Sequence, residues 1–102
     1  SGHAIRNSIF FSTVNGGSAS PQLRAVMLTT GVAGAVTIQN NLLTGASIGK
    51  YSTAAWHRGI WADVGNVSIS GNTFRSTRTA INLENSSGST IASNLFDVAG
   101  SG

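Results

Sequence analysis

Apolar and polar residues alternate along this chain in short segments, and one segment recurs four times. Each copy has an isoleucine followed five residues later by phenylalanine or leucine, and a polar pair of Asn, Gly or Ser lies between them. The copies begin at Ile5, Ile38, Ile69 and Ile91, which are 33, 31 and 22 residues apart. Recurrence of this kind indicates one supersecondary unit that is repeated with insertions of different length.

The pattern within each copy predicts strands and turns, with almost no helix. The segments 36–38 and 67–69 alternate as half-buried strands do, and each is stopped by Asn or Gly. A second apolar segment follows in the first three copies, at 26–28, 60–62 and 81–83. The distance to this segment is shortest in the third copy. We therefore expect insertions in the first two copies, at about 12–24 and 44–58.

The polar pairs predict sharp corners, because Asn tolerates the left-handed backbone conformation and Gly adopts it without a steric penalty. If the copies stack in register, Asn41, Asn72 and Asn94 form a ladder. Amide side chains at a strand spacing of about 4.8 Å can hydrogen-bond to one another along such a stack. The Phe or Leu after each corner then points back into the core.

Composition supports one folded domain covering residues 1–102. Only 9% of the residues are charged and 40% are hydrophobic, which is too apolar for a disordered segment. The net charge of +3 comes from six basic residues spread along the chain rather than clustered, so no nucleic-acid partner is expected. The chain has no cysteine, which excludes a disulfide scaffold and a thiolate metal site. No apolar stretch reaches the roughly 20 residues of a membrane span, so membrane insertion is not expected either.

The recurring phrase Val-x-Ile-x-(Gly/Asn)-Asn-x-(Phe/Leu), followed later by Gly-Ile or Ala-Ile, resembles the repeat of pectate-lyase-like proteins. The resemblance covers about Ile5 to Val98 apart from the insertions. It implies an all-β fold, a right-handed single-stranded parallel β-helix of about four rungs. It does not carry over one activity, because the family includes polysaccharide lyases, glycoside hydrolases, epimerases, phage tailspikes and adhesins.

Four rungs are few for such a fold, and neither end shows a polar cap. Open strand edges are protected in natural proteins, so we expect either a fragment or a homo-oligomer that covers its ends. Tailspikes and tail fibres are trimers of β-helical chains, and by this resemblance a trimer on a virion tail or another extracellular surface is expected.

Two of the three acidic residues fall in one column of the repeat. Asp63 lies three residues after Ile60, and Glu84 lies three residues after Ile81. Neighbouring rungs would separate these carboxyl groups by roughly 5 Å, close to the spacing in retaining glycosidases. Asp63 and Glu84 are therefore the candidate catalytic pair of a glycoside-hydrolase-like enzyme, and the alternative is two side chains at a solvated turn. Asp97 aligns with Arg75 one rung earlier, which predicts a surface ion pair.

No cofactor or metal is expected from the sequence. Three dispersed acids cannot form a calcium cage, which argues against a calcium-dependent lyase. His3 and His57 are far apart in sequence and have no cysteine to complete a zinc site.

The second insertion brings aromatic residues together. Tyr51, Trp56 and His57 precede Trp61, which alternates with buried neighbours and should face outward. Exposed indoles suit the C–H faces of sugars, and Arg58 could bind acidic groups. The glycan-binding candidates are therefore Tyr51, Trp56, His57, Arg58 and Trp61. A subunit interface or packing on the chain's own side are alternatives.

The function expected from these observations is recognition or display towards a polysaccharide or surface glycan by a segment of a tailspike-like, fibre-like or cell-surface protein. Two other hypotheses stay open. One is a polysaccharide-degrading or epimerising enzyme, and the other is a purely structural trimerisation module.

Overall fold

The computed structural model describes residues 2–14, 23–29, 35–46 and 54–97. These residues form strands and turns, and no helix occurs among them. The strands are β1 (His3–Arg6), β2 (Ile9–Ser12), β3 (Arg24–Leu28), β4 (Val36–Gln39), β5 (Leu42–Gly45), β6 (Trp56–Ala62), β7 (Val67–Ser70), β8 (Thr73–Arg75), β9 (Thr77–Leu83), β10 (Thr90–Ala92) and β11 (Leu95–Asp97). The predicted all-β class is confirmed.

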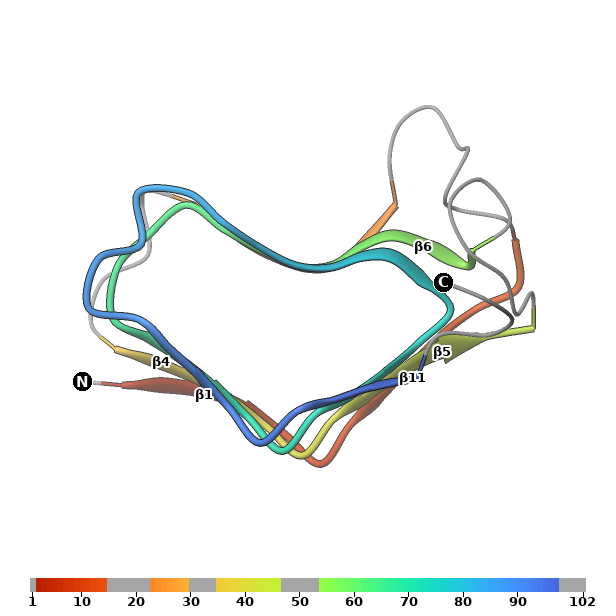
Figure 1. Cartoon of the computed structure of the whole chain (residues 1–102), viewed down its shortest axis with the longest axis horizontal. Helices are drawn as coiled ribbons and strands as arrows, with labels where there is room; N and C mark the ends of the chain where they lie inside the picture. Colours follow the sequence, from red (N-terminus) through yellow and green to blue (C-terminus); the bar gives the residue numbers. More distant parts are fainter. Residues whose placement is uncertain (1, 15–22, 30–34, 47–53, 98–102) are drawn as a thin grey trace.

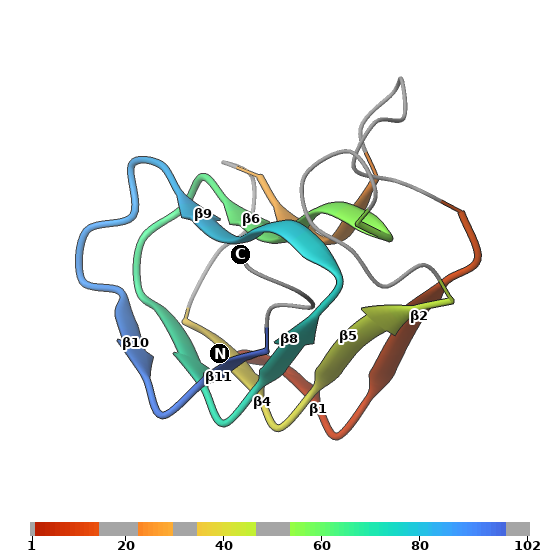
Figure 2. The same cartoon turned by 45° about the vertical axis from the view of Figure 1, so that its right-hand side comes forward.

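The strands form three sheets, and every pairing between them is parallel. The sheet orders are β1-β4-β7-β10, β11-β8-β5-β2 and β3-β6-β9. We call one pass through the sheets a rung: rung 1 is 3–28, rung 2 is 36–62, rung 3 is 67–83 and rung 4 is 90–97. Figure 1 shows the passes superposed, and Figure 2 shows them side by side from the red end to the blue end.

The register of the strands is the one that the repeated isoleucines predict. Ile5 pairs with Ile38, Ile38 with Ile69, and Ile91 with Ile69. In the second sheet, Phe10 pairs with Leu43, Leu43 with Phe74, and Phe96 with Phe74. Because side chains alternate along a strand, one set of equivalent positions faces inward in every rung.

The first two sheets meet at a sharp corner that is built in the same way in all four rungs. The residue two after each isoleucine has a positive φ, at Asn7 (53°), Asn40 (58°), Gly71 (67°) and Ser93 (58°). At position 71, glycine also leaves room for the side-chain oxygen of Asn40, which would have to move if residue 71 had a Cβ. The predicted corner residues are confirmed.

The asparagine ladder is also confirmed. Asn41 Nδ2 donates to Asn72 Oδ1 at 2.9 Å, and Asn72 Nδ2 donates to Asn94 Oδ1 at 3.0 Å. Each acceptor oxygen also receives the backbone N–H of the previous asparagine, at 3.0 and 2.9 Å. The other amide hydrogen of Asn72 bonds to Ile38 O at 2.9 Å, so this buried side chain has its donors and its acceptor satisfied.

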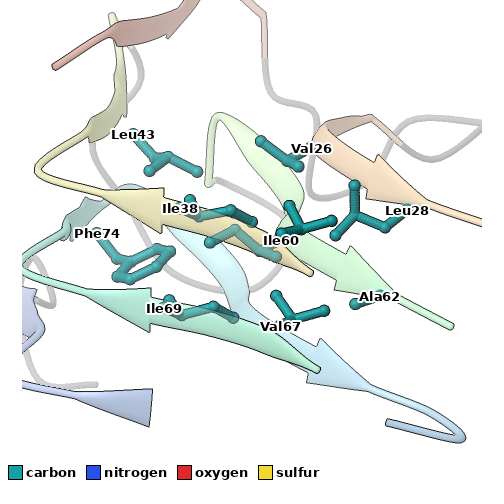
Figure 3. Packing of buried hydrophobic residues seen from close by; sticks show 10 residues of the cluster. Val26, Leu28, Ile38, Leu43, Ile60, Ala62, Val67, Ile69 and Phe74 are labelled. Atoms are coloured by element: carbon teal, nitrogen blue, oxygen red, sulfur yellow. The ribbon is translucent and has the colours of Figure 1, made fainter. Parts of the chain in front are cut away.

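The core lies between the three sheets and consists of stacked apolar columns. Ile38, Leu43, Ile60 and Ile69 are fully buried, and Phe74 is 2% exposed (Figure 3). Gly59 makes room for the Phe74 ring, because a Cβ at 59 would lie 3.1 Å from Phe74 Cδ2 and 2.7 Å from Ala80 O. Phe74 in turn stacks on Phe96, with ring centroids 5.2 Å apart and an angle of 8° between the rings.

The predicted insertions at 12–24 and 44–58 lie in part outside the described residues. Strand β5 continues to Gly45 and β6 begins at Trp56, so the connection between these strands is shorter than the predicted 44–58. Trp56, His57 and Arg58 consequently belong to a sheet rather than to a loop.

Candidate functional site

The outer face of the β3–β6–β9 sheet carries most of the candidate binding residues. All three strands place two consecutive residues against the core, at Ala25-Val26, Gly59-Ile60 and Ala80-Ile81. This interrupts the alternation, so that Arg58 and Trp61, three positions apart, come to the same outer face. In neighbouring columns, Met27, Trp61 and Asn82 are in register, and so are Arg24, Arg58 and Thr79.

Trp61 is the centre of a hydrogen-bond network on this face. Its Nε1 donates to Glu84 Oε2 at 2.6 Å. The amide of Asn82 is assigned with its oxygen toward Trp61 and Arg58, because this orientation satisfies both donors; the opposite one gives only a 3.4 Å contact of Nδ2 with Glu84 Oε2. Its oxygen then lies 3.0 Å from Trp61 Nε1 and 3.2 Å from Arg58 Nε. These hydrogen bonds hold the Nε1 edge of the indole in place, so that the ring presents a flat apolar surface in a fixed orientation.

A guanidinium group covers one face of this ring. The Cζ atom of Arg24 lies 5.2 Å from the centroid of Trp61, within the range of a cation–π contact. Arg24 Nη1 also lies 3.7 Å from Met27 Sδ, and Met27 is 49% exposed. We call this set the Trp61 surface. Its members are Arg24, Met27, Arg58, Trp61, Asn82 and Glu84.

His57 borders the Trp61 surface and is held by Arg58. Arg58 Nη1 lies 3.3 Å from His57 Nδ1, and because guanidinium only donates, Nδ1 is the acceptor and the ring is neutral. Desolvation, and then the charges of Arg58, Arg78 and Arg24, lower the pKa of His57 below its usual value of 6.5. Three arginines spread over the sequence thus create a positive potential at one place on the folded chain.

Comparison with family models, curated proteins and solved structures gave no match to this chain. Within residues 2–14, 23–29, 35–46 and 54–97, no three His, Asp or Glu side chains gather as metal ligands would. The same ranges contain no helix with the length and apolar character needed to cross a bilayer.

The other two aromatic candidates are not part of the Trp61 surface. Trp56 is half-buried, and its Nε1 donates to Thr44 O at 2.8 Å, so the polar edge of this indole is used within the fold. Tyr51 lies outside the described residues. The structure therefore brings together three of the five predicted glycan-binding residues, His57, Arg58 and Trp61.

The candidate catalytic acids directly follow the paired strands β6 and β9 but bind different partners. Ala62 pairs with Leu83, which places Asp63 beside Glu84 in the next positions. Asp63 Oδ1 accepts from Asn85 Nδ2 at 2.8 Å, whereas Glu84 Oε2 accepts from Trp61. The catalytic role of the pair stays a prediction. The predicted ion pair is confirmed, since Arg75 Nε lies 3.2 Å from Asp97 Oδ2 and both side chains are about half exposed.

Sequence reasoning missed Arg24, Met27 and Asn82 as members of the site. Met27 and Asn82 share a column with Trp61 when the second apolar segments are aligned, so the repeat contains a signal for them. The same alignment pairs Arg24 with Arg58, but the contact of Arg24 with the indole depends on the interrupted alternation of the sheet.

The lowered pKa of His57 leads to a prediction about stability. At pH values between the pKa of His57 in the folded chain and its unfolded value of 6.5, only the unfolded chain binds a proton at this residue. The free energy of unfolding should therefore fall as the pH drops below 6.5, and His57→Gln should make this decrease shallower. Urea denaturation of both proteins at a series of pH values measures the effect. Equal slopes for the two would contradict the assignment of a neutral His57.

Proposed function

We propose that this chain is a right-handed parallel β-helix that recognises a polysaccharide or surface glycan through the Trp61 surface. The parallel sheets, the stacked isoleucines and the asparagine ladder support the β-helix. We further propose, from the resemblance of the repeat, that it acts on a virion tail or another extracellular surface. A trimer remains a prediction of the same resemblance.

The observation that carries the glycan proposal is the surrounding of Trp61. Its indole is held at the edge by Glu84 and Asn82 and lies beside the exposed Met27. A pyranose ring offers an apolar C–H face and a rim of hydroxyl groups. The C–H face fits the immobilised indole ring. The hydroxyl groups fit carboxylate, amide and guanidinium groups that can accept or donate hydrogen bonds.

The test is a glycan-array measurement with the full chain, followed by titration of the best ligand. Trp61→Ala should weaken binding by about tenfold or more, which corresponds to roughly 1.4 kcal/mol. Ile9→Ala is the matched control, because Ile9 is 70% exposed on the outer face of a different sheet. Unchanged affinity of Trp61→Ala, or an array on which the wild-type chain binds nothing, would contradict the proposal.

A further inference from the structure

Arginine residues from all three strands of the β3–β6–β9 sheet act on His57. Arg24 lies in β3, Arg58 in β6 and Arg78 in β9. Desolvation, and then the charges of these three residues, lower the pKa of His57. Arg24 and Arg58 are also paired directly in the register of neighbouring strands. Like charges opposite each other destabilise a sheet, so this positive region favours the binding of an anion.

The acids of the chain leave this positive charge in excess. Asp97 lines a hollow together with Arg78, but its carboxylate pairs with Arg75. The carboxylate of Asp63 accepts from an asparagine amide, and that of Glu84 accepts from the indole N–H. The Trp61 surface thus contains one carboxylate against two arginines, and Arg78 adds a third positive charge beside it.

Arg58 connects His57 to the indole of Trp61. Its Nη1 lies 3.3 Å from His57 Nδ1. Its Nε lies 3.2 Å from the side-chain oxygen of Asn82, which also accepts from Trp61 Nε1. A sugar ring that packs on the indole therefore has its substituents close to Arg58, and through Arg58 close to His57.

The contact between His57 and Arg58 depends on protonation. Neutral His57 accepts from Arg58 at Nδ1, whereas a protonated imidazole is a donor at both ring nitrogens. Protonation at Nδ1 therefore ends this hydrogen bond and makes both side chains donors. An anion bound beside them offsets the repulsion from the arginines and so favours the protonated ring.

We propose that the glycan bound at the Trp61 surface carries an acidic group, a carboxylate or a sulfate, and that Arg58 and His57 bind this group with uptake of one proton. The inference rests on the proposed glycan recognition and adds to it the charge of the ligand and the pH dependence of binding. The proton comes from solvent and is held at Nδ1 of His57, and no covalent bond of the sugar changes.

The sign of the pH dependence follows from linkage. Because binding takes up a proton, affinity rises as the pH falls through the range in which His57 is neutral in the free chain and protonated in the complex. Between about pH 8 and about pH 5, where histidine changes its charge, the Kd should fall by about tenfold. A sugar carboxylate with a pKa of about 3.5 stays ionised throughout this range, and so does a sulfate, so the ligand does not contribute to the change.

Isothermal titration calorimetry in buffers of different ionisation enthalpy measures affinity and proton uptake together. The probes are an oligosaccharide that contains glucuronic acid, its carboxyl-reduced neutral form, and a sulfated oligosaccharide of the same length. The wild-type chain should bind an acidic probe at least about tenfold more tightly than the neutral one and take up a proton. Comparison of the two acidic probes decides between carboxylate and sulfate.

His57→Gln should bind the acidic probe without proton uptake and with an affinity that no longer changes with pH. His3→Gln is the matched control, because His3 is the other histidine of the chain and lies on β1 in a different sheet, and it should keep the pH dependence. Arg58→Gln should reduce the preference for the acidic probe by about tenfold. Arg75→Gln removes the same charge from β8 and should leave the preference unchanged. Circular dichroism at each pH confirms that the variants fold.

Equal affinity for the acidic and neutral probes, or a wild-type affinity that does not change with pH, would overturn this inference and leave glycan recognition in place. A pH dependence that persists in His57→Gln would overturn the role of His57. Equally tight binding of a single-stranded DNA oligonucleotide would also overturn the inference, because the surface would then recognise charge without the sugar. If no glycan binds at all, the proposed function fails and this inference fails with it.

Discussion

Asn72→Ala is expected to lower the free energy of unfolding by about 4 kcal/mol. The side chain is 1% exposed and serves four hydrogen bonds, to Asn41, Ile38 and Asn94. Its removal leaves the backbone N–H and one side-chain N–H of the buried Asn41 without an acceptor, and each such group costs about 1–3 kcal/mol. A domain of ordinary stability, about 5–15 kcal/mol, would lose a large part of it.

Urea denaturation followed by circular dichroism measures this loss. Asn82→Ala is the matched control, because it removes the same amide from the outer face of the β9 strand, where water can replace it. The control should lose about 1 kcal/mol or less. If Asn72→Ala lost no more than the control, water would be entering the corner and the ladder would not be a major source of stability.

The second large effect is expected from Phe74→Ala, also at about 4 kcal/mol. Phe74 is the largest fully buried side chain of the described residues, and it fills the space that Gly59 leaves open. Large-to-small changes of this kind cost about 3–5 kcal/mol, since the lost contacts are joined by a cavity that cannot collapse. Here the parallel sheets hold the walls of that cavity in place.

The matched control is Phe96→Ala, which removes the other ring of the same stack. Phe96 is 49% exposed, so the loss should be about 1–2 kcal/mol. Phe74→Leu provides a measurable intermediate if Phe74→Ala does not fold. Equal losses at the two positions would show that rung 4 is as well covered in solution as rung 3, which the exposure of Phe96 contradicts.

Much of the fold could be predicted because the recurring residues of the repeat allow only one strand register. Identical residue types at Ile5, Ile38, Ile69 and Ile91 bury together only if the strands are in one parallel register, since a slip of one residue would turn every side chain to the other face. The ladder follows from the same register, because an asparagine at an inner corner has to find its partner in the next copy.

The candidate site was only partly predictable. Trp61 was expected to face outward from the apolar segment 60–62, whereas Arg58 was expected in the insertion. The structure places both on one strand, because Trp56–Ala62 pairs along its length with Thr77–Leu83. Glu84 was predicted as half of a catalytic pair, and the structure places its carboxylate on the indole of Trp61. The sequence around Glu84 cannot decide whether its partner is Asp63 or Trp61, since both lie within reach of the same turn.

The sequence by itself determined the period, the corners, the inward columns and the pairing of Arg75 with Asp97, because each of these depends on positions that repeat. Only the tertiary structure decided which side chains share the outer face of the third sheet. There, paired small and branched residues such as Gly59-Ile60 both turn inward and break the alternation. The physical reason is that inward packing is governed by a common core shared by all rungs, whereas outer-face contacts depend on the local twist of one sheet and on side chains that occur once.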